Sequence, residues 1–217
     1  MGIPVLILGE SGSGKSASLR NFDPANVGVL NVAGKPLPFR KKLNVISTVK
    51  AEDGGTRRIN YSDILKILAR GKVKSYIIDD SQYLMAFEEL DRVKETGYNK
   101  FTEMALNFSG LVRYIIDCLP SDVIVYFLHH VETTDQGKIK AKTVGKMIDS
   151  KLTLEGLFSI VLLCEASADG HHFITQSDGY TTAKSPMEMF EKQIDNDLAM
   201  VDATIREYWN LGGNENG

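Results

Sequence analysis

The sequence predicts an α/β fold in which helices flank a mostly parallel central sheet. Short, nearly continuous apolar runs recur at residues 3–8, 27–32, 73–79 and 123–128, as expected of strands that are buried on both faces. Stretches with helical spacing lie between them, and this alternation is typical of parallel sheets, whose strands are joined by crossover helices. With 217 residues, 43% of them hydrophobic and 24% charged, the chain has the composition of an ordinary globular domain.

The remaining elements follow in order along the chain. An edge strand is expected at 46–49, and strands at 158–165 and 171–176 are expected to form a hairpin through the turn signal Asp169-Gly170. The polar, lysine-rich stretch 133–147 is expected to be a loop. Helical patterns cover residues 15–21, 62–69, 81–95, 100–119, 150–156 and 195–211. We therefore expect a single domain over 1–211, closed by a C-terminal β-hairpin and helix, and a disordered tail over 212–217.

Composition excludes several classes of protein. No apolar run reaches the length of about 18–20 residues that a membrane span needs, and the N-terminus shows no signal-peptide pattern, so we expect no membrane association. Cys118 and Cys164 are too few for a disulfide framework, which indicates reduced thiols and a cytoplasmic setting. The net charge of -3 means that binding to nucleic acid would depend on local basic patches.

The segment GESGSGKS, residues 9–16, follows the first apolar run and fits the pattern G-x-x-x-x-G-K-[ST]. Glycines let the backbone turn tightly and bring its N–H groups onto phosphate oxygens, and the helix expected to begin near Lys15 adds its N-terminal dipole. Lys15, expected to be an exposed loop side chain, would neutralise the β- and γ-phosphates, and Ser16 would ligate Mg²⁺. The alternative is a turn that matches by chance. The predicted nucleotide contacts are Gly9, Glu10, Ser11, Gly12, Ser13, Gly14, Lys15, Ser16 and Ala17.

A carboxylate pair follows the apolar strand at 73–79. A P-loop enzyme needs an acid that holds magnesium through water from the end of a neighbouring strand, and we assign Asp79 to that role. Asp80 is the candidate for orienting the attacking water. The alternative is that Asp80 or Ser81 only caps the helix that follows.

Two histidines follow the strand at 123–128. Enzymes of this kind place a polar residue that senses the γ-phosphate at the end of a strand adjacent to the P-loop strand. Alternation along a strand directs one of His129 and His130 toward the site and the other away, and His130 is included among the catalytic candidates. The alternative is a polar strand end in contact with solvent. His171 and His172 are expected to be solvated or core histidines.

The densest basic stretch is GKIKAKTVGK, which contains Lys138, Lys140, Lys142 and Lys146. Three interpretations remain open. The stretch is a solvated loop, or Lys138 and Lys140 contact nucleic-acid phosphates, or Lys142 or Lys146 reaches the γ-phosphate of a neighbouring subunit as an arginine finger does. A weaker basic region includes Arg40 and Lys41, which are further candidates for DNA contact.

Four segments carry a resemblance to a known family: GESGSGKS, SYIIDD, FLHHVE and TVGKMIDSKLTLEGLFSIVLL. They resemble the phage-encoded P-loop ATPases with a RecA-like core, which include the Sak-type single-strand annealing and recombination ATPases. The resemblance covers residues 3–163, and the segment 185–209 also looks like the tail of such proteins. It implies a five-stranded parallel core, ATP with Mg²⁺, assembly into rings or filaments, and phage DNA recombination or replication in the cytoplasm of an infected or prophage-carrying bacterial cell.

One departure from the RecA-like pattern bears on activity. These enzymes usually carry a catalytic glutamate at the end of the strand after the P-loop helix, but residues 29–33 contain no acid. Either Asp80 takes over, with Glu10 as a weaker candidate, or hydrolysis is slow and the protein is a nucleotide-gated, weakly catalytic interaction protein.

The function expected from the sequence is a Mg²⁺-dependent ATPase, slow or stimulated by DNA, that couples ATP to single-stranded DNA recombination, annealing or replication. Its expected partners are single-stranded DNA, a single-strand-binding protein and further copies of the chain. A P-loop kinase of a nucleotide or small molecule is the main alternative. The absence of arginine from 133–147 counts against it, because such kinases usually close an arginine-rich lid over the phosphates.

Overall fold

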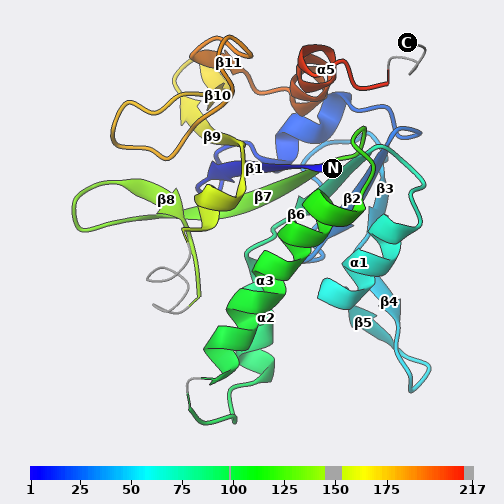
Figure 1. Ribbon diagram of the computed structural model, residues 1–217. Coiled ribbons are helices and arrows are strands. Elements are labelled where there is room, and N and C mark those ends of the chain that lie inside the picture. Colours follow the sequence, from blue (N-terminus) through cyan, green and yellow to red (C-terminus); the bar gives the residue numbers. More distant parts are fainter. Residues whose placement is uncertain (98, 145–152, 213–217) are drawn as a thin grey trace.

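The protein is an α/β structure built on one mostly parallel sheet, which confirms the fold class expected at this level (Figure 1). The computed structural model describes residues 1–97, 99–144 and 153–212. Within them the sheet has nine strands in the order β11-β10-β9-β1-β7-β6-β2-β3, with β8 paired to β7. Neighbours from β9 to β3 are parallel, while β8, β10 and β11 pair antiparallel. The strands are β1 (Ile3–Gly9), β2 (Val27–Asn31), β3 (Asn44–Ile46), β6 (Ser75–Asp79), β7 (Ile124–Thr133), β8 (Ile139–Ala141), β9 (Ile160–Ser167), β10 (Gly170–Ile174) and β11 (Gln193–Asp195), with β4 (Thr48–Lys50) and β5 (Thr56–Arg58) in a separate hairpin.

Helices cover both faces of the sheet, and a hydrophobic cluster lies on each (Figure 1). Successive side chains of a strand point to opposite faces. Ile78 and Phe127 therefore belong to one cluster, while Ile77 and Tyr126 belong to the other. The first face is covered by α1 (Tyr61–Ala69), α2 (Tyr83–Asp91), α3 (Asn99–Cys118) and the 3₁₀ helix η2 (Leu154–Leu157), and the second by the 3₁₀ helix η1 (Ser16–Asn21) and α5 (Leu198–Tyr208).

A buried polar network fixes α5 to the amino-terminal ends of β6 and β7. The carboxylate of Asp202 accepts hydrogen bonds from Ser75 Oγ at 2.8 Å, Tyr126 Oη at 3.0 Å and Arg206 Nε at 2.7 Å. Arg206 also donates to the carbonyl of Asp122 at 2.8 Å. Because these polar groups satisfy one another, the C-terminal helix can pack on the sheet without leaving a buried donor or acceptor unpaired.

The expected helix after the glycine loop is shorter and tighter than predicted. Residues 15–21 were expected to form an α-helix, but the structure has the 3₁₀ helix η1 over Ser16–Asn21. Phe22 already has extended backbone at φ -58° and ψ 142°, two residues before Pro24. The chain thus has room for only about two turns.

The prediction of a loop over residues 133–147 is wrong in part, because β8 pairs with the end of β7. In this hairpin Lys138, Lys140 and Lys142 alternate with Ile139 and Ala141. Alternation of polar and apolar residues is the pattern of a half-buried strand, and the high charge of the stretch obscured it.

Other expectations concern segment ends and membranes. The expected edge strand at 46–49 is divided between β3 and β4. Of the expected helix at 150–156, the structure describes residues 153–156, and the 3₁₀ helix η2 begins there at Leu154. Residues 213–217 of the expected tail lie outside the described residues. None of the helices in the described part of the chain is long and apolar enough to cross a membrane.

We predict that Asp202→Ala lowers the free energy of unfolding by about 2–4 kcal/mol, because it leaves the buried hydroxyls of Ser75 and Tyr126 without their acceptor. Denaturant unfolding followed by circular dichroism measures the change. Asp117→Ala, at an exposed acid of α3, is the matched control and should stay within about 0.5 kcal/mol of the wild type. Equal stability of the two variants would contradict the role given to the network.

Candidate functional site

The residues singled out for chemistry meet at the carboxyl ends of the parallel strands. In register, Gly9 of β1 lies beside His130 of β7, and Asn31 of β2 lies beside Asp79 of β6. Ligands of open α/β sheets bind outside this edge, because loops that leave neighbouring strands converge there. The parallel sheet therefore brings together residues that lie more than a hundred positions apart in the sequence.

The glycine loop, residues 9–16, is packed so closely that a side chain does not fit at two of its glycines. A Cβ on Gly9 would lie 2.4 Å from Ser13 Oγ and 2.7 Å from the carbonyl oxygen of Cys164. A Cβ on Gly14, whose φ is +102°, would lie 2.8 Å from the ring of His171. The loop is thus a tight turn with its backbone exposed at the sheet edge, the form that suits backbone N–H groups to an anion.

Lys15 lies folded back over its own loop and is buried, contrary to the exposed position expected from the sequence. Its side chain is 6% exposed, and Nζ donates to the carbonyl oxygens of Gly9 at 2.7 Å and Glu10 at 2.8 Å. Burial lowers the pKa of the ammonium group, and the nearby carboxylates of Asp79 and Asp80 oppose the shift. The cation is therefore held at the loop by neutral carbonyls that an anionic ligand could replace.

Ser16 and Asp79 form the direct link between the loop and the sheet. Ser16 Oγ donates to Asp79 Oδ1 at 2.9 Å. Burial and the charge of Asp80 raise the pKa of Asp79 to about 6, while the Ser16 hydrogen bond and Lys15 act in the opposite direction. The expectation that the acid comes from a directly neighbouring strand needs correction, since β7 lies between β1 and β6. A hydroxyl and a carboxylate oxygen in contact are suited to hold one Mg²⁺.

Asp80 occupies a strained position beside Asp79. Its φ is +58°, in the left-handed region that is uncommon for residues other than glycine. Its carboxylate lies 2.7 Å from Lys35 Nζ and accepts a hydrogen bond from His130 Nε2 at 3.2 Å. Burial alone would raise its pKa, but the His130 hydrogen bond and the Lys35 ammonium outweigh burial, so the pKa lies below its ordinary value. This carboxylate is ionised near neutral pH.

The alternative in which Asp80 or Ser81 caps the following helix is wrong. The N-cap of α2 is Gln82, with αR backbone. The side chain of Asp80 pairs with Lys35 and His130, and Ser81 Oγ lies within hydrogen-bond distance of Leu128 O and the His129 ring. Both side chains are thus directed toward neighbouring strands and loops.

The two histidines at the end of β7 lie in different surroundings. His129 is fully buried, donates from Nε2 to the carbonyl of Lys142 at 2.8 Å, and has Nδ1 2.9 Å from Ser81 Oγ. Since a carbonyl only accepts, the proton is on Nε2, and burial lowers the pKa of His129 to about 4. His130 instead reaches the site, where its ring packs edge-on against Tyr83 with centroids 6.2 Å apart.

Lys35 is a site residue that the sequence reasoning missed. Asn31, at the end of β2, shapes the loop that carries it: the side chain donates to Lys35 O and accepts from Gly34 N, both at 2.7 Å. Lys35 Nζ thereby reaches Asp80 and lies 5.3 Å from the ring centroid of Tyr83. Its hydrogen bond with Asp80 raises the pKa of the ammonium. The available signal was its position just beyond the carboxyl end of a predicted core strand.

His171 was also missed as a site residue. It lies on β10, and its Nδ1 donates to the carbonyl of Ser13 at 2.8 Å, while Cys164 Sγ donates to the same oxygen at 3.0 Å. His171 is exposed, as expected of a solvated histidine, but its ring also packs against Gly14. The C-terminal hairpin therefore holds the glycine loop from the side opposite β7.

These side chains surround one cavity of about 350 Å³, which we call the loop cavity. Its volume lies in the range of ligand sites. Gly9, Glu10 and Ser13, which were also predicted to contact the nucleotide, are not part of the cavity wall. The wall is formed by Ser11, Gly12, Gly14, Lys15, Ser16, Ala17, Lys35, Pro36, Pro38, Asp79, Asp80, His130 and His171.

The lysines of the basic stretch lie away from the wall of the loop cavity. Lys140 pairs with Glu132 at 2.9 Å across the β7–β8 hairpin, and Lys138 and Lys142 are exposed. Lys146 lies outside the described residues. The structure thus places the described lysines on the hairpin surface.

Arg40 and Lys41 are exposed in the segment that joins β2 to β3. They follow Pro38, which lines the loop cavity. They are therefore surface residues beyond its rim and are not part of its wall.

We predict that His129 makes the protein less stable in acid. Its pKa falls from an ordinary 6.5 to about 4 on folding, so its contribution to stability is complete above the unfolded pKa and is lost as the pH falls toward the folded one. From about pH 7.5 to about pH 5.5 the loss is about 1 kcal/mol. Asp79, with its raised pKa, titrates in this range with the opposite sign.

Denaturant unfolding of wild type and His129→Gln at both pH values isolates the histidine, because Asp79 contributes equally to the two proteins. The variant should lack the acid-dependent loss. Parallel pH profiles would contradict the assignment of a neutral, buried His129.

No protein-family model matches the chain, and no curated protein matches it. The interpretation of the site therefore depends on its own geometry and chemistry.

Proposed function

We propose that the chain is a RecA-like P-loop NTPase that binds and hydrolyses ATP with Mg²⁺. One observation carries the proposal: Ser16 of the glycine loop donates to Asp79 at 2.9 Å, beside the buried ammonium of Lys15. A hydroxyl, a carboxylate and a cation at the mouth of a glycine turn are the groups that a magnesium-bound triphosphate needs.

The residues present fit a magnesium ion that is shared with phosphates. Among the described residues there is no cluster of three or more His, Cys, Asp or Glu side chains that would hold a metal alone. Mg²⁺ commonly uses one or two protein oxygens, with substrate phosphates and waters completing its shell. Ser16 and Asp79 would supply the protein oxygens, and Mg²⁺ would supply charge neutralisation at the β- and γ-phosphates.

Lys15 would bind phosphate, and Asp80 would orient the attacking water. Lys15 would exchange the carbonyls of Gly9 and Glu10 for phosphate oxygens, which are stronger acceptors for an ammonium group. Asp80, ionised between Lys35 and His130, would accept the hydrogen bond of the attacking water. Asn31 stands where a glutamate is usual, and its side chain supports the Lys35 loop. Asp80 would therefore replace the missing acid, at the cost of a slow reaction.

The strand order supports a RecA-like interpretation. The five adjacent parallel strands β9-β1-β7-β6-β2 agree with the five-stranded core that the family resemblance implies, and β3 adds a sixth strand at the edge. The strand that ends in His130 lies beside the glycine-loop strand, as expected of a γ-phosphate sensor.

The biological role proposed with this activity is the coupling of ATP to single-stranded DNA recombination, annealing or replication in a phage. It rests on the sequence resemblance, as do assembly into rings or filaments and a cytoplasmic location. Lys142 is exposed on the hairpin and remains the described candidate for reaching a neighbour's γ-phosphate.

We predict that Lys15→Met weakens MgATP binding by roughly 30- to 150-fold, corresponding to about 2–3 kcal/mol for a lost charge-assisted contact. Methionine keeps the unbranched chain and removes only the cation. Titration with a fluorescent ATP analogue measures the affinity, and Lys72→Met, at an exposed lysine before β6, is the control. Unchanged affinity in Lys15→Met would exclude the proposed phosphate site.

We predict that Asp80→Asn lowers the rate of ATP hydrolysis by about 10²- to 10⁴-fold, because an amide cannot accept the proton of the attacking water. Phosphate release with Mg²⁺, with and without single-stranded DNA, measures the rate. Asp117→Asn serves as the matched control. Hydrolysis by Asp80→Asn at the wild-type rate would remove Asp80 from the mechanism, and binding without turnover by the wild type would favour a nucleotide-gated interaction protein.

A further inference from the structure

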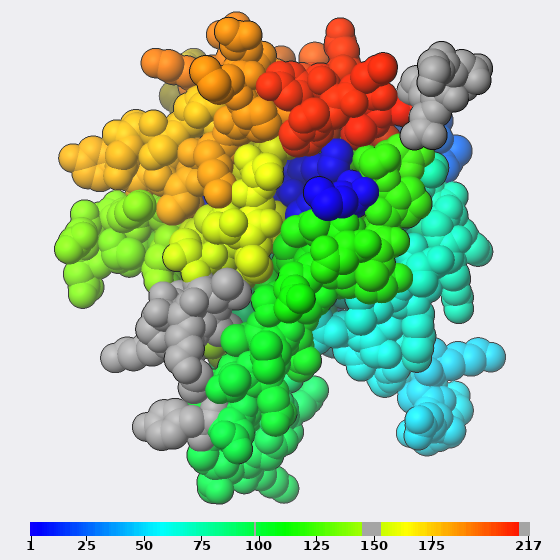
Figure 2. All heavy atoms as spheres, viewed as in Figure 1, coloured from blue at the N-terminus to red at the C-terminus, as the bar shows by residue number. Residues whose placement is uncertain are grey.

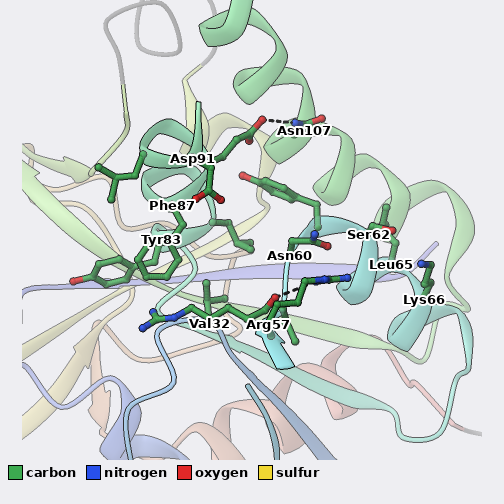
Figure 3. Close-up of a pocket in the computed structure, with 16 residues that line it drawn as sticks. Val32, Arg57, Asn60, Ser62, Leu65, Lys66, Tyr83, Phe87, Asp91 and Asn107 are labelled. Carbon is green, nitrogen blue, oxygen red and sulfur yellow. Dashed lines mark hydrogen bonds between the residues drawn. The ribbon is translucent and has the colours of Figure 1, made fainter. Parts of the chain in front are cut away.

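A second and larger cavity, of about 930 Å³, lies on the face of the sheet that carries α1, α2 and α3 (Figure 3). We call it the lateral cavity. Tyr83 and Phe87 lie along one side of it, and Ser62, Leu65 and Lys66 lie along another (Figure 3). Figure 2 shows the α2–α3 pair and the β4–β5 hairpin projecting from the same side of the molecule, with open space between their tips.

Aromatic rings and a cation form one wall of the lateral cavity. The rings of Tyr83 and Phe87 have centroids 5.3 Å apart at an angle of 34°, and the guanidinium of Arg58 lies 4.7 Å from the centroid of Phe87. Flat aromatic surfaces of this kind stack nucleobases, and an arginine on the ring adds a cation beside the base.

The charges around the lateral cavity leave cationic groups available at its rim. Arg58 is exposed and uses one nitrogen to donate to Ala33 O at 3.2 Å, and Lys66 lines the same cavity. The acid Glu88 is compensated, because its Oε1 accepts hydrogen bonds from Asn107 at 2.7 Å and Arg92 at 3.2 Å. Asp91 is a second acid of this wall, so the phosphates are expected at Arg58 and Lys66.

Two buried polar atoms of the lateral cavity lack a partner among the described residues. They are Tyr61 Oη and Glu88 Oε2. An unpaired buried acceptor costs about 1–3 kcal/mol, and exocyclic amino groups of bases are donors that a carboxylate accepts. Both atoms have almost no exposed surface, so Tyr61 or Glu88 would have to turn toward the cavity to meet the donating edge of a base.

We propose that the lateral cavity binds single-stranded nucleic acid, with a base on the Tyr83–Phe87 wall and backbone phosphates at Arg58 and Lys66. The inference rests on the proposed function and names the surface on which single-stranded nucleic acid would bind and influence the ATP site. A base inserts between aromatic and polar walls, and the strand continues through the open space between the two projections.

Tyr83, in the wall of the lateral cavity, contacts two residues that line the loop cavity, and these contacts supply a route for coupling. The ring of Tyr83 packs against His130 and lies 5.3 Å from Lys35 Nζ. Arg58 contacts the carbonyl of Ala33, two residues before Lys35. A nucleic-acid strand that moves Tyr83 or Arg58 would therefore act on the two groups that hold Asp80, and the rate of hydrolysis would then depend on DNA.

The test is binding of a fluorescently labelled oligothymidylate, followed by anisotropy at two salt concentrations. Arg58→Gln should weaken binding roughly 3- to 10-fold and reduce the salt slope by about 0.7, the value for one phosphate contact to a single strand. Phe87→Leu should weaken binding by about 5- to 150-fold through lost stacking, with the salt slope unchanged. The control, Arg113→Gln, alters an exposed arginine of α3 and should bind as the wild type does.

Circular dichroism and MgATP titration accompany each binding curve. If Phe87→Leu fails to fold, the surface variant Arg58→Gln decides the question. Binding by wild type and by both folded variants with equal affinity would overturn the lateral cavity as the site while leaving the proposed ATPase intact. If the wild type does not bind MgATP but the variants weaken oligonucleotide binding as expected, the proposed ATPase is wrong and the lateral cavity remains the nucleic-acid site.

Discussion

The candidate site depends on the parallel register of the central strands. That register sets Gly9 beside His130 and Asn31 beside Asp79, at the edge where the loops leave the sheet. A slip of β6 by one residue would turn Asp79 to the face covered by α3 and separate it from Ser16. The apolar side chains of β1, β6 and β7 are almost fully buried on both faces, and this burial makes such a slip costly. The packing of the core therefore also fixes the geometry of the site.

Two adjacent carboxylates in this site have opposite surroundings. Asp79 is buried against a hydroxyl and its pKa rises to about 6, whereas Asp80 lies between Lys35 and His130 and its pKa falls. Neighbouring acids whose environments separate their pKa values commonly take different chemical roles. The proposed division, with metal binding at Asp79 and orientation of water at Asp80, follows this difference. Asp80 has left-handed backbone, and its carboxylate lines the same cavity as that of Asp79.

The parallel core could be predicted because its strands are nearly continuous apolar runs, and α3, at Asn99–Cys118, lies within one residue of the expected 100–119. The elements that could not be predicted are short or polar: β11 has three residues, and β8 carries lysines. The sequence also predicted that Lys15, Ser16 and Asp79 belong to one site for phosphate and Mg²⁺. It did not reveal Lys35 or His171, because the position of Lys35 depends on a loop shaped by Asn31 and that of His171 on a contact of the C-terminal hairpin with the glycine loop.

In the proposed function, the backbone of the glycine loop holds the phosphates of ATP. Hydrogen exchange of the amides of residues 9–16, measured by mass spectrometry with MgATP and with AMP, tests it most directly. We expect slower exchange across this segment with MgATP and little change with AMP, since only the triphosphate carries the β- and γ-phosphates that the loop would bind. Equal exchange in all states at saturating MgATP would contradict the account.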